Sequence, residues 1–199
     1  MSQDGVNKGR RRFLMAASGT LGAVGGVGVA FPLLSSWQPS ERAKAVGAPV
    51  TIDIGSLGSG EMVSVEWRGK PIFVVRRTPE MLEMLRRDDL RERLLDPDSE
   101  NATQQPEYAS TPLRSREEAL LVLEGVCTHL GCAPQYRPEV TAQSFDDNWR
   151  GGFFCACHGS RFDMAGRVFR GVPAPANLVV PPHYTDGDLL TIGEDGGVA

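Results

Sequence analysis

The sequence predicts an all-β domain, an antiparallel sandwich with one inserted helix, preceded by a single N-terminal transmembrane helix. The 22 uncharged residues from Phe13 to Leu34 predict the transmembrane helix, because a helix of that length is ~33 Å long and a hydrocarbon core is ~30 Å thick. Short segments that alternate apolar and polar residues, separated by glycine and proline, predict the strands. The 199 residues are 41% apolar, enough for one domain with a core, and the net charge of −4 gives no case for nucleic acid.

Residues 1–12 form a basic segment that we expect to stay in the cytoplasm. The segment carries Lys8 and three successive arginines, Arg10–Arg12, against one acid, Asp4, and positive charge favours the cytoplasmic side of a membrane helix. The run Arg10–Leu14 resembles a twin-arginine export signal, whose pathway moves folded proteins. The domain that follows the helix is therefore expected in the periplasm of a bacterium, attached to the inner membrane.

The apolar segment, residues 13–34, is either kept as an anchor or removed as a signal peptide. The small residues of Ala43-Lys44-Ala45 offer a cleavage site. Against cleavage, the run is longer than the usual signal core of about 7–15 residues, and the Gly22-x-x-x-Gly26 spacing permits close helix packing in a membrane. We expect an anchor, followed by a flexible hinge linker over residues 35–49, which are rich in proline, glycine and small residues.

The main domain covers residues 50–199 and is expected to begin with hairpin strands. Strands are predicted over Val50–Ile54, Met62–Trp67, Pro71–Val75, Ala119–Glu124, Arg167–Phe169, Asn177–Val180 and Leu189–Ile192. Thr78-Pro79-Glu80 predicts a helix start, with a capping hydroxyl, proline at the first position and an acid near the positive end. The charged residues 86–118 are expected to complete that helix and then form a surface flap, solvated or facing a partner.

Two short motifs contain all four cysteines and two of the three histidines. The first is Cys127-Thr128-His129-Leu130-Gly131-Cys132, and the second is Cys155-Ala156-Cys157-His158-Gly159-Ser160. Zinc sites usually pair two cysteines and then two histidines, whereas here each motif mixes a thiolate with an imidazole. This mixture suits a cluster of two irons in which one iron takes both thiolates and the other both imidazoles. A single zinc ion remains the alternative.

Together the motifs resemble those of Rieske 2Fe–2S proteins, specifically the iron–sulfur subunits of bacterial quinol-oxidising cytochrome bc complexes. Rieske-type oxygenases and their ferredoxins share the ligand spacing but generally lack the second cysteine pair. The resemblance implies one 2Fe–2S cluster in a Rieske-type fold, with a small cluster-binding subdomain at about residues 125–176. It implies four metal ligands, Cys127, His129, Cys155 and His158, and a disulfide between Cys132 and Cys157 that clamps the two loops.

The resemblance also implies roles for the residues around the cluster. His158 is expected to contact quinol and, with His129, to be catalytic, because a ligating imidazole can take up a proton when the cluster is reduced. The Ser160 hydroxyl is expected to donate to a bridging sulfide, and Leu130 to shield the cluster, the alternative for Leu130 being core packing. Phe162 stands where many members have a tyrosine that donates to a ligand sulfur, which predicts a lower reduction potential.

Two further features complete the comparison with this family. Gly171–Pro175 resembles the family's Gly-Pro-Ala-Pro loop, which covers a third side of the cluster, with Val172 as an additional residue. His183 lies outside both motifs and is expected to be a surface or packing residue and not a ligand.

The resemblance implies a subunit of quinol–cytochrome c reductase, the translocase of a respiratory chain. Such a subunit takes an electron from quinol at the cytochrome b site, with proton release, and passes it to a c-type cytochrome, while the hinge lets its domain swing. The implied partners are cytochrome b, the c-type cytochrome and quinol, in a dimeric complex. One alternative is the small Rieske subunit of a periplasmic oxidase such as arsenite oxidase, and another is a zinc-stabilised binding module without a redox role.

Overall fold

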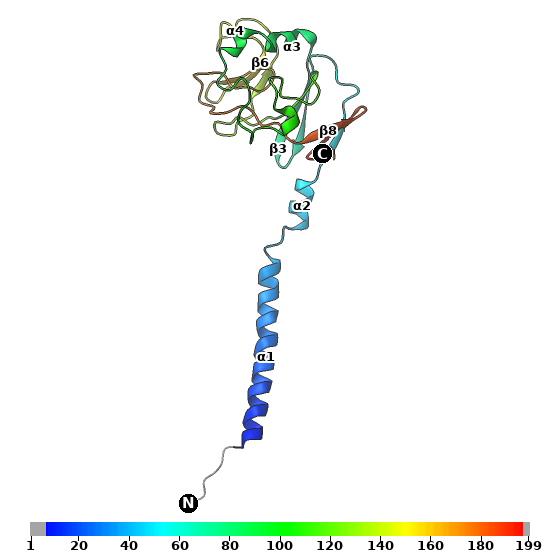
Figure 1. The fold of residues 1–199 in the computed structure, drawn as a ribbon, viewed down its shortest axis with the longest axis vertical. Coiled ribbons are helices and arrows are strands. Elements are labelled where there is room, and N and C mark those ends of the chain that lie inside the picture. Colours follow the sequence, from blue (N-terminus) through cyan, green and yellow to red (C-terminus); the bar gives the residue numbers. More distant parts are fainter. Residues whose placement is uncertain (1–6, 197–199) are drawn as a thin grey trace, which may run out of the picture. The chain divides into compact units, whose positions relative to one another are not determined.

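The computed structural model describes residues 7–196 and divides into two units, residues 1–45 and 46–199 (Figure 1). The first unit holds α1 (Lys8–Ser35), which begins where the Asn7 side chain accepts hydrogen bonds from the backbone N–H groups of Gly9 and Arg10. This helix is long and apolar enough to cross a membrane, a test that a signal sequence also passes. The predicted apolar helix is therefore confirmed and extends through the three arginines, whereas Asp4 lies outside the described residues.

The predicted linker, residues 35–49, is not wholly irregular, because α2 (Glu41–Gly47) lies within it. The Ser40 hydroxyl accepts a hydrogen bond from the backbone N–H of Ala43, and Glu41 pairs with Lys44 one turn along at 2.7 Å. These local contacts stabilise a short helix. It was not predicted, because its sequence shows no helical period of apolar residues. The hinge role of this segment stays a prediction.

In the described part of the second unit, residues 46–196, the strands form three antiparallel sheets of three strands each, which confirms the predicted all-β class. The sheet orders are β1-β9-β8, β2-β3-β4 and β5-β6-β7. Their bounds are β1 (Val50–Asp53), β2 (Met62–Trp67), β3 (Lys70–Arg76), β4 (Leu120–Glu124), β5 (Gln135–Arg137), β6 (Gly152–Cys155), β7 (Ser160–Phe162), β8 (His183–Asp186) and β9 (Leu189–Ile192).

The β2-β3-β4 sheet lies between two cores, because β3 and β4 are buried on both faces. Successive strand residues point to opposite faces. Accordingly Phe73 and Leu123 belong to the larger core, which they share with Phe153 of β6. Val74 and Val122 belong to the smaller core, which they share with Leu190 and Ile192 of β9. The central sheet therefore separates the β1-β9-β8 sheet from the sheet that carries the second motif.

Two short helices, and not the one predicted, occupy the insertion between β3 and β4: α3 (Pro79–Leu85) and α4 (Asp88–Arg91). A 3-10 turn, η1 (Glu107–Ala109), follows them. Thr78 caps α3 as predicted, its hydroxyl accepting from the Met81 N–H. The expectation of a surface flap, solvated or facing a partner, is wrong for part of the insertion, because Leu90 and Leu94 belong to the larger core and Arg114 is fully buried.

Three buried arginines fasten the insertion to residues 163–167. The Arg114 guanidinium donates to the carbonyls of Ala165 and Gly166, and Arg77 donates to those of Leu113, Glu118 and Met164. The Arg167 guanidinium pairs with Asp163 at 2.7 Å and also donates to the Leu85 and Pro97 carbonyls. Burial lowers the pKa of Arg77 and of Arg114 to about 10. Backbone carbonyls thus take the place of water around three arginine side chains that the sequence alone would suggest are exposed.

Two of the predicted strands are wrong, and four observed strands, β5, β6, β7 and β8, were not predicted. Residues 167–169 form only isolated bridges, from Val168 to Phe162 and from Phe169 to Leu94. Residues 177–180 form single hydrogen bonds and no ladder: the Leu178 N–H donates to Gly166, the Val180 N–H to Gln104, and the Val179 carbonyl accepts from Glu124 at the end of β4. These four strands have only three or four residues each, which is too few to show a recognisable alternation of apolar and polar residues.

Candidate metal centre

The two cysteine–histidine motifs fold into loops of the same form. The first motif follows β4, and the second forms the turn between β6 and β7. In each loop a glycine N–H donates to the carbonyl of the first cysteine, Gly131 to Cys127 and Gly159 to Cys155, both at 2.9 Å. These glycines have φ of +84° and +80°, values that favour glycine. The repeated turn presents one cysteine and one histidine from each loop.

The four predicted ligands provide two buried thiols and two neighbouring imidazoles. Cys127 and Cys155 are free thiols, 3% and 2% exposed. The rings of His129 and His158 are perpendicular, with centroids 4.7 Å apart. His158 is exposed and His129 is half-buried. The structure therefore places the thiols inside and the imidazoles nearer the surface.

The environment of these donors fits a metal cluster. Within the part of the chain that the structure describes, the buried Nδ1 of His129 has no hydrogen-bond partner, an arrangement that is costly unless the nitrogen binds something else. Burial raises the pKa of the Cys155 thiol, and the hydrogen bond with Cys127 raises it further. A metal is the usual means of holding such thiols as thiolates. Two thiolates and two imidazoles form the ligand set of a Rieske centre.

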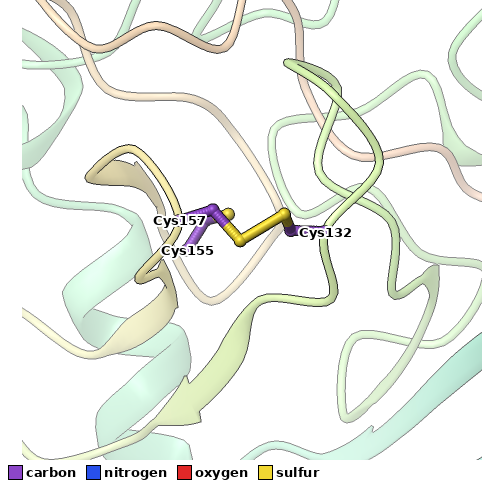
Figure 2. Close-up of side chains that lie close together, drawn as sticks. All are labelled: Cys132, Cys155 and Cys157. Carbon is purple, nitrogen blue, oxygen red and sulfur yellow. A yellow bond between two sulfur atoms is a disulfide. The ribbon is translucent and has the colours of Figure 1, made fainter.

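A disulfide joins the two loops, as predicted. Cys132 of the first motif bonds to Cys157 of the second, with their Cα atoms 6.7 Å apart, and Figure 2 shows this bridge beside the Cys155 side chain. The sulfur atoms of Cys132, Cys155 and Cys157 lie within 4.8 Å of one another. We do not assign this trio to a metal, because two of its sulfurs are consumed by the disulfide. The contact shows instead that the covalent clamp lies against a predicted ligand.

The proline loop, residues 171–175, lies next to both motifs. The backbone N–H of Ala174 donates to the Ser160 hydroxyl at 3.0 Å, and both residues are buried. The Thr128 hydroxyl donates to the Ala176 carbonyl at 2.6 Å. Because Ser160 accepts from Ala174, its own hydroxyl proton remains available for a neighbouring acceptor. Sequence reasoning missed Thr128, although its position between two predicted ligands was a signal.

The structure shows which of the other residues singled out in the sequence are exposed and which are buried. Leu130 is 71% exposed, so the core-packing alternative for this residue is wrong. Phe162 is fully buried and pairs with Phe153 across β6 and β7. His183 is a buried packing residue whose Nδ1 lies 2.8 Å from the Pro181 carbonyl. A cavity of about 670 Å³ lies under the insertion, and the residues that line it include none of the four predicted ligands.

Two family models match this chain. Residues 1–40 match the model described as "Ubiquitinol-cytochrome C reductase Fe-S subunit TAT signal", and residues 49–182 match the Rieske [2Fe-2S] domain. The two matches correspond to the twin-arginine segment with its apolar helix and to most of the second unit.

Curated relatives match along the whole chain. The ubiquinol-cytochrome c reductase iron-sulfur subunit of Allochromatium vinosum is 52% identical over 200 residues, covering 100% of this chain and 95% of the relative. The subunit of the same name from Blastochloris viridis is 39% identical over 199 residues, covering 100% and 99%. A chain of a solved structure titled "Hyperthermophilic respiratory Complex III" is 28% identical with a TM-score of 0.49, covering 88% of this chain and 98% of that one.

These matches decide between the alternatives that the sequence left open. A zinc-stabilised module does not account for a match to the Rieske [2Fe-2S] model over residues 49–182. A small oxidase subunit is not favoured, because the relatives reported above are reductase subunits and the description of the N-terminal model names the same subunit. The chain belongs to the Rieske [2Fe-2S] family and, within it, to the iron–sulfur subunits of ubiquinol–cytochrome c reductase.

Proposed function

We propose that this chain is the mobile electron carrier of a cytochrome bc complex, which takes an electron from quinol and delivers it to a c-type cytochrome. One observation carries the proposal beyond family membership. Two buried free thiols lie in adjoining loops with two neighbouring imidazoles, of which His158 is exposed. A centre with a buried sulfur side and an accessible nitrogen side can meet a substrate through the imidazole while the protein shields the rest.

In this proposal Cys127 and Cys155 would hold the cluster from its buried side, and His129 and His158 would hold it from the side nearer the surface. The order of burial supports the assignment, since both cysteines are buried and the histidines are more exposed. When bound, the cluster supplies a one-electron acceptor of raised reduction potential, because imidazoles replace two thiolates. Ser160, whose hydroxyl oxygen accepts from the Ala174 N–H, would have its hydroxyl proton free to donate to the bound cluster.

The residues at the exposed side bind and orient quinol. The second ring nitrogen of His158, in its unprotonated form, accepts a hydrogen bond from a quinol hydroxyl and then holds the proton that the quinol releases. His129 is the second catalytic imidazole and is more shielded. Leu130, 71% exposed in the first loop, excludes water beside that contact and packs against the rim of the quinol site. The same exposed tip is the part of the domain that meets its partners.

The proposed setting is the bacterial inner membrane, with the Rieske domain in the periplasm. An apolar helix of 28 residues and the match to an export-signal model support an anchored, exported domain. The basic residues Arg10–Arg12 precede the apolar run, which favours a cytoplasmic N-terminus. The proposed partners are cytochrome b and a c-type cytochrome in a dimeric complex, and the segment that contains α2 serves as the hinge.

Electron paramagnetic resonance of ascorbate-reduced membranes tests this function. A rhombic signal whose average g lies below that of four-cysteine clusters, and whose line shape changes with a quinol-site inhibitor, is the expected result. A signal indifferent to the inhibitor would contradict quinol oxidation, and metal-loaded protein without an iron signal would contradict the cluster.

A matched pair of variants tests the exposed tip. Leu130→Ala should weaken the response of the line shape to the inhibitor and lower quinol turnover. Leu189→Ala removes another exposed leucine, 48% exposed on β9, and should leave both unchanged. Equal behaviour of the two variants would show that Leu130 does not meet the quinol site.

A further inference from the structure

We propose that Asp146, held between Arg93 and Arg161, is a positioning residue that fixes the second cluster loop, residues 155–160, from its outer side. None of these three residues belongs to the ligand motifs. The proposal rests on the ligand assignment made above. The proposal assigns to part of the insertion and to the segment between the motifs the role of supporting this loop.

The β6–β7 hairpin that carries the loop has two faces. Cys155 pairs with Ser160, and both are buried toward the cluster side. The next pair along the hairpin, Phe154 with Arg161, is half-buried on the opposite face, because side chains alternate along a strand. Whatever packs against Phe154 and Arg161 therefore sets the position of the neighbouring ligand and hydroxyl.

Residues 143–149 cover this outer face. Gln143 and Asp146 bond to each other as a tight bridged turn. The ring of Phe145 stacks on Phe154 with centroids 3.8 Å apart and planes 4° from parallel. Asp146 Oδ2 accepts from Arg161 Nη1 at 3.0 Å, and the same Nη1 donates to the Phe145 carbonyl. Both outward residues of the hairpin are thus held by adjacent residues of one turn.

Arg93 of the insertion completes the arrangement. Its Nη2 donates to Asp146 Oδ2 at 2.5 Å, and its Nη1 donates to the Asn148 carbonyl at 2.6 Å. The Asp146 side chain is only 6% exposed, against 30% for Arg93 and 23% for Arg161. One shielded carboxylate thus joins two guanidiniums from distant parts of the chain. Without its charge the two cations would face each other across a poorly solvated gap.

Through these contacts Asp146 influences the position of the second cluster loop. The residues that it and Phe145 hold are immediate sequence neighbours of Cys155 and Ser160. Groups that orient metal ligands without touching the metal typically change metal retention or activity by about 10–100-fold when they are replaced. We therefore expect loss of the Asp146 charge to loosen the second loop while the fold and the disulfide persist.

The test is the rate of cluster loss from the purified full-length protein, followed as bleaching of the visible absorbance in excess chelator, well below the unfolding temperature. Asp146→Asn should lose its cluster about tenfold faster than wild type. Asp146→Glu, which keeps the charge, should recover most of the retention. Asp147→Asn removes an adjacent, exposed carboxylate and should behave as wild type.

A destabilised control separates positioning from general weakening. Leu190→Ala opens the smaller core, which contains no predicted ligand, and should lower Tm at least as much as Asp146→Asn. Faster cluster loss and broader resonance lines in Asp146→Asn than in Leu190→Ala would support the proposal. Equal cluster loss in the two, or unchanged loss in Asp146→Asn, would overturn it. Lack of a Rieske signal in the wild-type protein would instead overturn the proposed function.

Discussion

Replacing Asp163 with asparagine should destabilise the Rieske domain strongly, because this carboxylate is the buried counter-ion of Arg167. Asp163 is fully buried and Arg167 is 1% exposed. Asp163 Oδ2 accepts from Arg167 Nε at 2.7 Å, while Oδ1 accepts from the backbone N–H groups of Ala165 and Arg167. An asparagine can keep one oxygen in place, but its NH₂ group would then face the guanidinium donor.

The magnitude follows from the charges left behind. Arg77 and Arg114, both buried, also experience the Asp163 charge, which raises the pKa of each against the larger lowering by burial. Removing one partner of a buried ion pair typically costs about 3–5 kcal/mol. For a domain of this size about 1 kcal/mol lowers Tm by roughly 2–4 °C, so we expect a fall of about 6–20 °C.

Differential scanning calorimetry of the full-length protein measures this change. Asp186→Asn, which neutralises an exposed carboxylate at the end of β8, is the matched control and should shift Tm by less than about 2 °C. The double variant Asp163→Asn/Arg167→Met should recover part of the loss of Tm, because the Arg167 guanidinium is no longer present as a buried cation without its partner. A loss for Asp163→Asn no larger than for Asp186→Asn would refute the reasoning.

Three further perturbations have defined outcomes. Phe162→Tyr should raise the reduction potential in a redox titration, by adding a donor near a ligand sulfur; equal potentials would contradict the assigned role of position 162. Gly152→Ala should prevent folding or cluster assembly, measured as absorbance per protein, because its Cβ would lie 2.0 Å from the Phe162 carbonyl at a φ of +145°. Burial lowers the pKa of His183 in the folded protein. As the pH falls below about 6.5, the unfolded chain therefore takes up a proton at this histidine before the folded protein does. The free energy of unfolding then decreases until the pH reaches the lowered pKa. His183→Gln should therefore flatten the decline of Tm as the pH falls below about 6.5, and an unchanged decline would assign it to other groups.

The two cysteine–histidine motifs could be recognised in the sequence because their residues are close together in the chain. Cys127 and His129, or Cys155 and His158, lie on one loop whatever surrounds it, and Gly131 and Gly159 permit the turn. The apolar run that forms most of α1 is likewise a property of composition and length. The strands β2, β3, β4 and β9 were predicted because burial on one or both faces leaves an apolar pattern in the sequence.

Only the tertiary structure decided how the loops are supported, because that support is polar and distant in sequence. Arg77 and Arg114 read as surface residues until backbone carbonyls from far along the chain surround them. Arg93 and Asp146 carry no local signal, and their contact across 53 residues gives the insertion its proposed task. The short strands β5 and β7 exist because β6 offers partners on both sides. The sequence by itself determined the apolar helix and the two motifs whose cysteines and histidines are the predicted ligands, whereas folding determined which charges are buried and what supports the loops that carry these motifs.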